Sequence, residues 1–183
     1  MFDKKLNSAM NRIKKVLFWF NYKLFSNSLH GTHSPFVYKF LEEVVYKNTV
    51  INSNKYYLRA GSNTKKYNEL IHRMIQYFKI KSVIKCNNLS ETDCIENINN
   101  TEVIELLILD ASESSHNLYE HSLKKINECS IFVIDGLRSS DYQLNLWKKI
   151  QSDDRAIVTI DLFEIGIVFF RTQQPKENFL IDY

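Results

Sequence analysis

The sequence predicts an open α/β sheet of about five strands, mostly parallel with an antiparallel C-terminal hairpin, preceded by N-terminal helices. From residue 64 onward, short apolar runs alternate with amphipathic helical stretches, an order typical of parallel sheets with crossover helices. The runs at 106–110 and 131–135 are almost entirely apolar, as in strands covered on both faces. The chain has 183 residues and 44% hydrophobic content, enough for one core. We therefore expect a helical region over 1–62 and one compact α/β unit over 63–183.

A basic amphipathic helix is predicted over residues 4–28. Residues 1–29 hold six lysines and arginines against one acid, Asp3, so the local charge is six minus one, or +5. A basic, aromatic helix of this kind could contact an anionic membrane surface. We favour the commoner arrangement, in which the helix packs across the domain or against a second subunit with its lysines in water. The predicted apolar face recurs at spacings of three and four: Leu6, Met10, Ile13, Leu17, Phe20 and Leu24.

A second helix is predicted to start at Ser34, because a hydroxyl N-cap followed by proline at the first helical position is a typical start. It should run from Pro35 to about Tyr46. His30 and His33 lie in the turn before it. No third metal ligand stands near them, so turn hydrogen bonds are the better interpretation of this pair.

The α/β unit follows in regular order. A helix over 64–79 should bury one face, formed by Tyr67, Leu70, Ile71, Met74 and Phe78. The other expected elements are strands at 82–86, 106–110 and 131–135, helices at 115–128 and 140–150, and an antiparallel pair of strands at 156–162 and 166–171. Eighteen residues separate Cys86 from Glu105, which leaves room for one short helix, about Glu91 to Ile98, and a loop.

Composition excludes several classes of protein. Cys86, Cys94 and Cys129 form no C-x-x-C pair, so neither a zinc knuckle nor a disulfide framework is indicated. We expect three buried thiols in a reducing cytosol, and hence a cytoplasmic protein. The apolar run at 16–20 is too short for a signal sequence or a membrane span. A net charge of +3 does not favour nucleic acid as a partner.

The glycines are few and far apart. The chain has four, each 30 or more residues from the next, which excludes G-x-G-x-x-G, the Walker loop and the nucleophile elbow. The turn after the first strand holds Asn87 and Asn88 instead. A close approach of backbone to phosphate or nucleoside favours residues without a Cβ, and this turn has none.

Asp110 and Asp135 each end an apolar strand and are the candidate catalytic residues. Ligands of open α/β sheets bind beyond the carboxyl ends of the strands. If the two strands are neighbours, about 4.8 Å apart, the carboxylates could hold a divalent metal or act on a substrate proton. The structural alternative, which we favour, is that Asp110 caps the next helix and that Asp135-Gly136 forms a turn. The stretch from His116 to His121 has neither zinc-protease spacing.

Two motifs carry a resemblance to a known family. The stretch VTIDLFEIGIVFF, residues 158–170, and HGTHSPF near the start resemble bacterial class I SAM-dependent methyltransferases, which have a Rossmann-like fold. The resemblance covers roughly residues 28–85 and 104–183. It implies that the strands ending in Asp110 and Asp135 correspond to the family's fourth and fifth strands. In metal-dependent O-methyltransferases of this fold, acids at these two positions hold a cation near the acceptor oxygen.

The departures from the family fall where the cofactor binds. The family's first strand ends in an acid and a glycine-rich turn, whereas this chain has Lys85, Cys86, Asn87 and Asn88. The family then forms two further strand–helix units, which need about 50 residues; the 18 residues here cannot supply them. The resemblance therefore implies that the half-sheet for SAM is deleted and that Asn87 and Asn88 are the remnant of a cofactor-binding loop.

We expect a non-catalytic protein without a cofactor, which binds a protein partner or forms a homodimer through its N-terminal helices. The strand at 82–86 would become a sheet edge, covered by the loop 87–104 or by another chain. One alternative is an active SAM-dependent, metal-assisted O-methyltransferase that uses Asp110 and Asp135. Another is a peripheral membrane protein held by helix 4–28.

Overall fold

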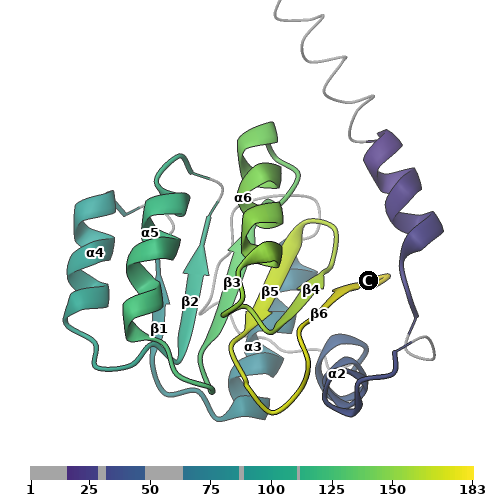
Figure 1. The fold of residues 1–183 in the computed structure, drawn as a ribbon, viewed down its shortest axis with the longest axis horizontal. Helices are drawn as coiled ribbons and strands as arrows, with labels where there is room; N and C mark the ends of the chain where they lie inside the picture. Colours follow the sequence, from purple (N-terminus) through teal and green to yellow (C-terminus); the bar gives the residue numbers. More distant parts are fainter. Residues whose placement is uncertain (1–15, 29–31, 48–63, 87–88, 111) are drawn as a thin grey trace, which may run out of the picture.

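A six-stranded mixed sheet with helices on both faces organises the chain (Figure 1). The structure, a computed structural model, describes residues 16–28, 32–47, 64–86, 89–110 and 112–183. The strand order is β1-β2-β3-β5-β4-β6. The strands are β1 (Val83–Lys85), β2 (Leu106–Leu109), β3 (Ile131–Asp135), β4 (Val158–Asp161), β5 (Ile165–Phe169) and β6 (Glu177–Leu180).

The predicted sheet is confirmed, with one strand more than expected. β1, β2 and β3 are parallel neighbours, and β5 pairs antiparallel with both β3 and β4. β6 adds a parallel edge strand beside β4. Its sequence, ENFL, buries only Phe179, so it carries no apolar run by which the strand could be recognised.

Serine caps begin several of the helices. The side chains of Ser34, Ser90 and Ser140 each accept a hydrogen bond from the backbone N–H three residues ahead. The start predicted at Ser34 is thus confirmed. The helices are α2 (Pro35–Phe40), which continues as a π-helical turn (Leu41–Val45), α3 (Thr64–Phe78), α4 (Glu91–Asn99), α5 (Ser115–Ser122), which ends in a 3₁₀ turn (Leu123–Lys125), and α6 (Asp141–Ser152).

The central strands are buried on both faces, which explains their unbroken apolar runs. Ile108 and Val133 face a core shared with α2 and α3, whereas Leu107 and Phe132 face a core shared with α4, α5 and α6. The face predicted for α3 is confirmed: its members pack in the first core, with Phe78 only partly buried.

One of the two arrangements predicted for the N-terminal helix is wrong in the part that the structure describes: its apolar stripe does not pack across the domain. Packing against a second subunit stays a prediction. Residues 16–25 are helical, but Leu17, Phe20 and Leu24 are exposed, Leu24 to 71%. The residue that packs on the domain is Tyr22, which is 3% exposed and lies off the apolar stripe. Periodicity identified the apolar stripe, but a sequence does not say which side of a helix meets the domain.

Candidate functional site

The two predicted acids lie side by side at the carboxyl edge of the sheet. Leu109 of β2 is paired with Ile134 of β3, and Asp110 and Asp135 are the next residue on each strand. The adjacency on which the site prediction depends is therefore present. Lys85 ends β1 at the same edge.

Asp135 is buried on the face of the sheet that α3 covers. Successive side chains of a strand point to opposite faces, and the preceding residue, Ile134, packs in the core on the other face. Asp135 is 7% exposed. Burial raises the pKa of the Tyr67 phenol on α3, and the charges of Glu164 and Asp135 raise it further. Burial lowers the pKa of Lys85, which the charge of Asp135 opposes. Tyr67, Lys85 and Asp135 thus share one electrostatic environment.

The turn predicted at Asp135-Gly136 is present. Gly136 has a φ of 78°, a left-handed conformation that glycine adopts without strain. Its N–H donates to the carbonyl of Glu164 at 2.8 Å, and the N–H of Leu137 donates to the same oxygen at 3.0 Å. The turn ties the end of β3 to the β4–β5 hairpin.

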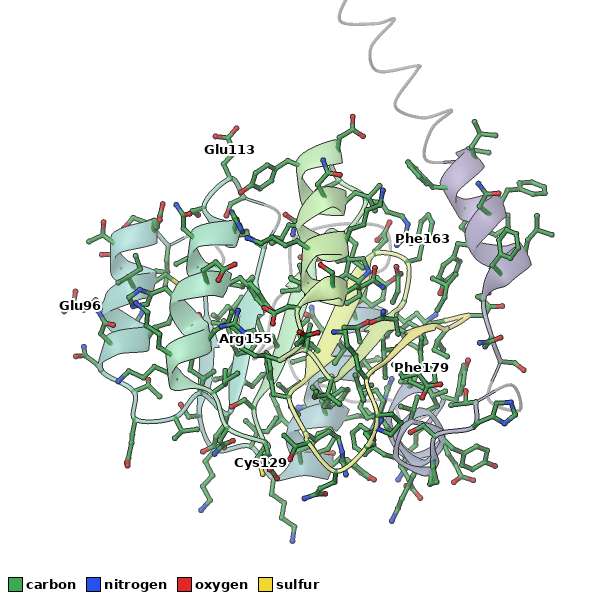
Figure 2. All side chains as sticks on the ribbon, in the orientation of Figure 1. Glu96, Glu113, Cys129, Arg155, Phe163 and Phe179 are labelled. Atoms are coloured by element: carbon green, nitrogen blue, oxygen red, sulfur yellow. A yellow bond between two sulfur atoms is a disulfide. The ribbon has the colours of Figure 1, made fainter. Side chains whose placement is uncertain are left out.

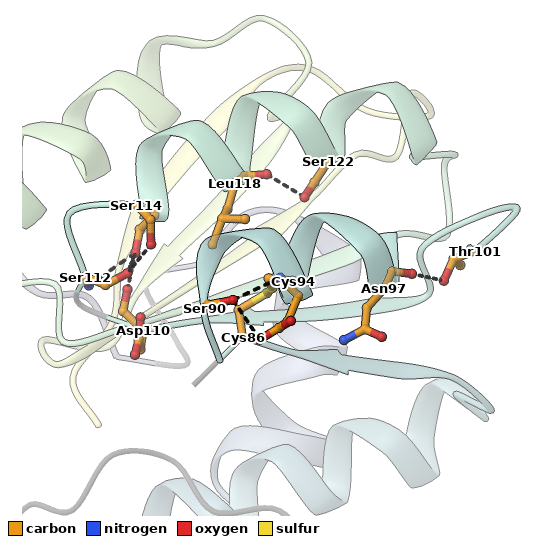
Figure 3. The surroundings of a disulfide bond; sticks show 12 residues. Cys86, Ser90, Cys94, Asn97, Thr101, Asp110, Ser112, Ser114, Leu118 and Ser122 are labelled. Carbon is orange, nitrogen blue, oxygen red and sulfur yellow. Dashed lines mark hydrogen bonds between the residues drawn. A yellow bond between two sulfur atoms is a disulfide. The ribbon is translucent and has the colours of Figure 1, made fainter. Parts of the chain in front are cut away.

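Asp110 leads into a loop held by hydroxyl groups. Its backbone carbonyl accepts a hydrogen bond from the Ser115 hydroxyl at 2.5 Å. The Ser112 hydroxyl lies 3.0 Å from those of both Ser114 and Ser115 (Figure 3). The main chain of Asp110, rather than a capping carboxylate, thus makes this contact with the start of α5.

In the connection from β1 to β2, a disulfide bond joins Cys86, directly after β1, to Cys94 in α4 (Figure 3). This bond corrects the prediction of three buried thiols. Their Cα atoms are 5.5 Å apart, within the range that a disulfide requires. The pairing arises because α4 starts directly after the turn, so that its first turn brings Cys94 back to the end of β1. The remaining thiol, Cys129, is exposed. Asn87 and Asn88, the candidate cofactor-binding residues, lie outside the described residues.

The histidine candidates do not converge. His30 lies outside the described residues, and His33 is exposed. The Nε2 atom of His121 lies 2.8 Å from Asn99 Oδ1, whereas that of His116 lies 3.8 Å from a carboxylate oxygen of Glu120. Within the described ranges, no three His, Cys, Asp or Glu side chains are placed to hold a metal ion.

A pocket of about 240 Å³ lies at the other end of the sheet, away from the two acids. Figure 2 shows Cys129, one of its lining residues, at the end of the molecule opposite to Glu113. The guanidinium of Arg171 lies over the ring of Phe36 in this pocket, 3.7 Å from its centroid. Neither Asp110 nor Asp135 therefore lines this pocket.

Asp161 is a buried polar centre that sequence reasoning missed. Both carboxylate oxygens accept hydrogen bonds from the Arg138 guanidinium, at 2.9 and 2.8 Å. One oxygen also accepts from the indole N–H of Trp147 at 3.2 Å, and the other from the backbone N–H of Phe163 at 2.8 Å. Asp161 is the last residue of β4, as Asp135 is of β3, and Asp110 directly follows β2. This shared position of an acid at the end of an apolar strand could have identified Asp161 from the sequence. Its full set of donors identifies it as a residue that stabilises the fold.

Comparisons with protein families, with curated proteins and with solved structures found no match to this chain. The strand order and pairing alone assign its Rossmann-like α/β open sheet.

Proposed function

We propose that this chain is a class I SAM-dependent methyltransferase-like domain that does not bind the cofactor and acts as a partner-binding or scaffolding domain. The observation that carries the proposal is the connection between β1 and β2. In the enzymes that the chain resembles, this connection holds two further strand–helix units, and the acid that binds the cofactor ribose ends one of their strands. Here it holds α4, and β2 lies directly beside β1.

The residues at the end of β1 do not fit SAM. The family's acidic residue and glycine-rich turn are replaced by Lys85 and Cys86, and Cys86 is bonded to Cys94 in α4. A positive charge replaces the expected acid, and a cross-link joins the end of β1 to α4.

The metal-assisted alternative loses support at the same edge of the sheet. Asp110 and Asp135 are adjacent, but the third position of the family's metal site is Gly136, which has no side chain. Asp135 is also buried, 7% exposed, which supports a structural role rather than contact with a substrate.

Titration calorimetry of the full chain with SAM and with its demethylated product tests the proposal. We expect no binding tighter than about 100 μM, roughly 5.5 kcal/mol of binding free energy. An active class I methyltransferase serves as the positive control. The variant Cys94→Ser should also fail to bind, which would show that the cross-link alone does not block the site.

Binding below that concentration by the unmodified chain would refute the proposal. If Asp110→Asn and Asp135→Asn then abolished methyl transfer while SAM still bound, the chain would be the O-methyltransferase of the alternative interpretation.

A further inference from the structure

The helix at 16–25 presents a large apolar surface to solvent. Its exposed side chains include Val16, Leu17, Phe20, Leu24 and Phe25, each more than half accessible. Within the described ranges, no helix combines the length and the apolar content needed to cross a bilayer. A helix of this kind can instead lie along a surface.

The exposed stripe is held pointing away from the domain. At about 100° per residue, Leu17, Phe20 and Leu24 lie within roughly 60° of one another, and Tyr22 lies on the opposite side of the helix. Tyr22 packs on Phe163, with ring centroids 5.1 Å apart. Because the buried side chain is opposite the stripe, the stripe cannot turn toward the domain without loss of this contact.

Further contacts hold the end of the helix. The Tyr22 hydroxyl donates to the carbonyl of Ile181, and Lys23 pairs with Asp182. The backbone N–H of Asn27 donates to the carbonyl of Leu180 at 2.7 Å, and Asn27 forms a parallel bridge with Ile181. The end of the helix is therefore bonded to residues 180–182, at and just after the end of β6 (Figure 1).

The charge of this segment selects the kind of partner. Residues 1–29 carry the local charge of +5, with Lys14 and Lys15 directly before the exposed helix. A second copy would bring two such segments together, and like charges across an interface oppose association. An anionic bilayer offers both an apolar phase for the stripe and negative charge for the lysines.

We propose that helix 16–25 docks this protein on anionic lipid bilayers, with Leu17, Phe20 and Leu24 inserted at the level of the headgroups. This inference does not depend on the proposed loss of SAM binding.

Co-sedimentation of the full chain with lipid vesicles tests it. Binding is expected to vesicles of phosphatidylcholine with about 30 mol% phosphatidylglycerol, to weaken at high salt, and to be far weaker with phosphatidylcholine alone. The double variant Leu17→Asp/Phe20→Asp should lower the vesicle affinity by about tenfold or more, because it places charge in the apolar stripe. Lys14→Glu/Lys15→Glu should lower it on anionic vesicles.

The matched control is Leu89→Asp, which changes an exposed leucine on the β1–α4 connection and should leave vesicle binding unchanged. Circular dichroism verifies that each variant is folded. Equal sedimentation of the unmodified chain and the Leu17→Asp/Phe20→Asp variant would overturn the proposal. So would an absence of vesicle binding by the unmodified chain together with a dimer, seen by light scattering, that this variant dissociates.

Discussion

The Arg138–Asp161 pair allows a quantitative test of what holds the β4–β5 hairpin to the rest of the domain. Their side chains are 10% and 5% exposed, so water cannot replace a lost partner. The change Arg138→Met removes both charge-assisted hydrogen bonds to Asp161, each contributing about 1.5–3 kcal/mol, and a third hydrogen bond to the carbonyl of Phe163. It leaves the Asp161 carboxylate buried with two neutral donors. We expect a loss of about 3–5 kcal/mol in the free energy of unfolding, the usual cost of breaking a buried pair.

The measurement is urea unfolding followed by far-UV circular dichroism, with linear extrapolation to water. Arg155→Met is the matched control, because Arg155 also makes a two-pronged contact with an aspartate, Asp153, but is 53% exposed. Its loss should be about 1 kcal/mol or less. The double variant Arg138→Met/Asp161→Leu should recover much of the stability, since it removes both charges. If the two single arginine variants lost equal stability, the assignment of Asp161 as a buried stabilising centre would be refuted.

Three further changes test other parts of the structure. Gly166→Ala should destabilise by about 1–3 kcal/mol in the same urea assay, because its Cβ would lie 2.5 Å from the Trp147 ring. Cys94→Ser should lower stability by about 2–3 kcal/mol, as expected for a nine-residue loop, and a reducing agent should then weaken the unmodified chain but not the variant. Burial, and then the charge of Asp153, raise the pKa of the Tyr119 phenol, so the unfolded chain loses this proton first as the pH rises. Stability should therefore fall above about pH 10, and Tyr119→Phe should make the fall less steep, as measured by urea unfolding across that range.

The sheet was predictable because burial on both faces leaves a clear pattern. The sequences of β2 and β3 are unbroken apolar runs. Asp110 directly follows the first run and Asp135 ends the second, which correctly predicted that both acids lie at one edge of the sheet. β6 was not predictable, since an edge strand with one buried residue has no such pattern and exists because β4 offers it a partner.

The missed features depend on tertiary distances. Cys86 and Cys94 are brought together by where α4 starts, and a separation of eight residues is not a motif. Asp161 became recognisable as a buried centre only when the fold placed Arg138, 23 residues away, and Trp147 around it. The direction of the N-terminal helix was set by Tyr22, a single residue outside the apolar stripe.

The two borders of the sheet differ in a way that limits how the protein could polymerise. At one border, Asn27 pairs with the backbone of Leu180 and Asp182, at and just beyond the end of β6. At the other border, β1 has β2 as its only strand neighbour within the described ranges. Growth by strand addition needs two free borders, one to receive a copy and one to offer to the next. Asn27 obstructs the end of the border beside β6, whereas β1 has no such contact in the described ranges, so β1 is the border at which a second copy would add most readily, as a twofold pair.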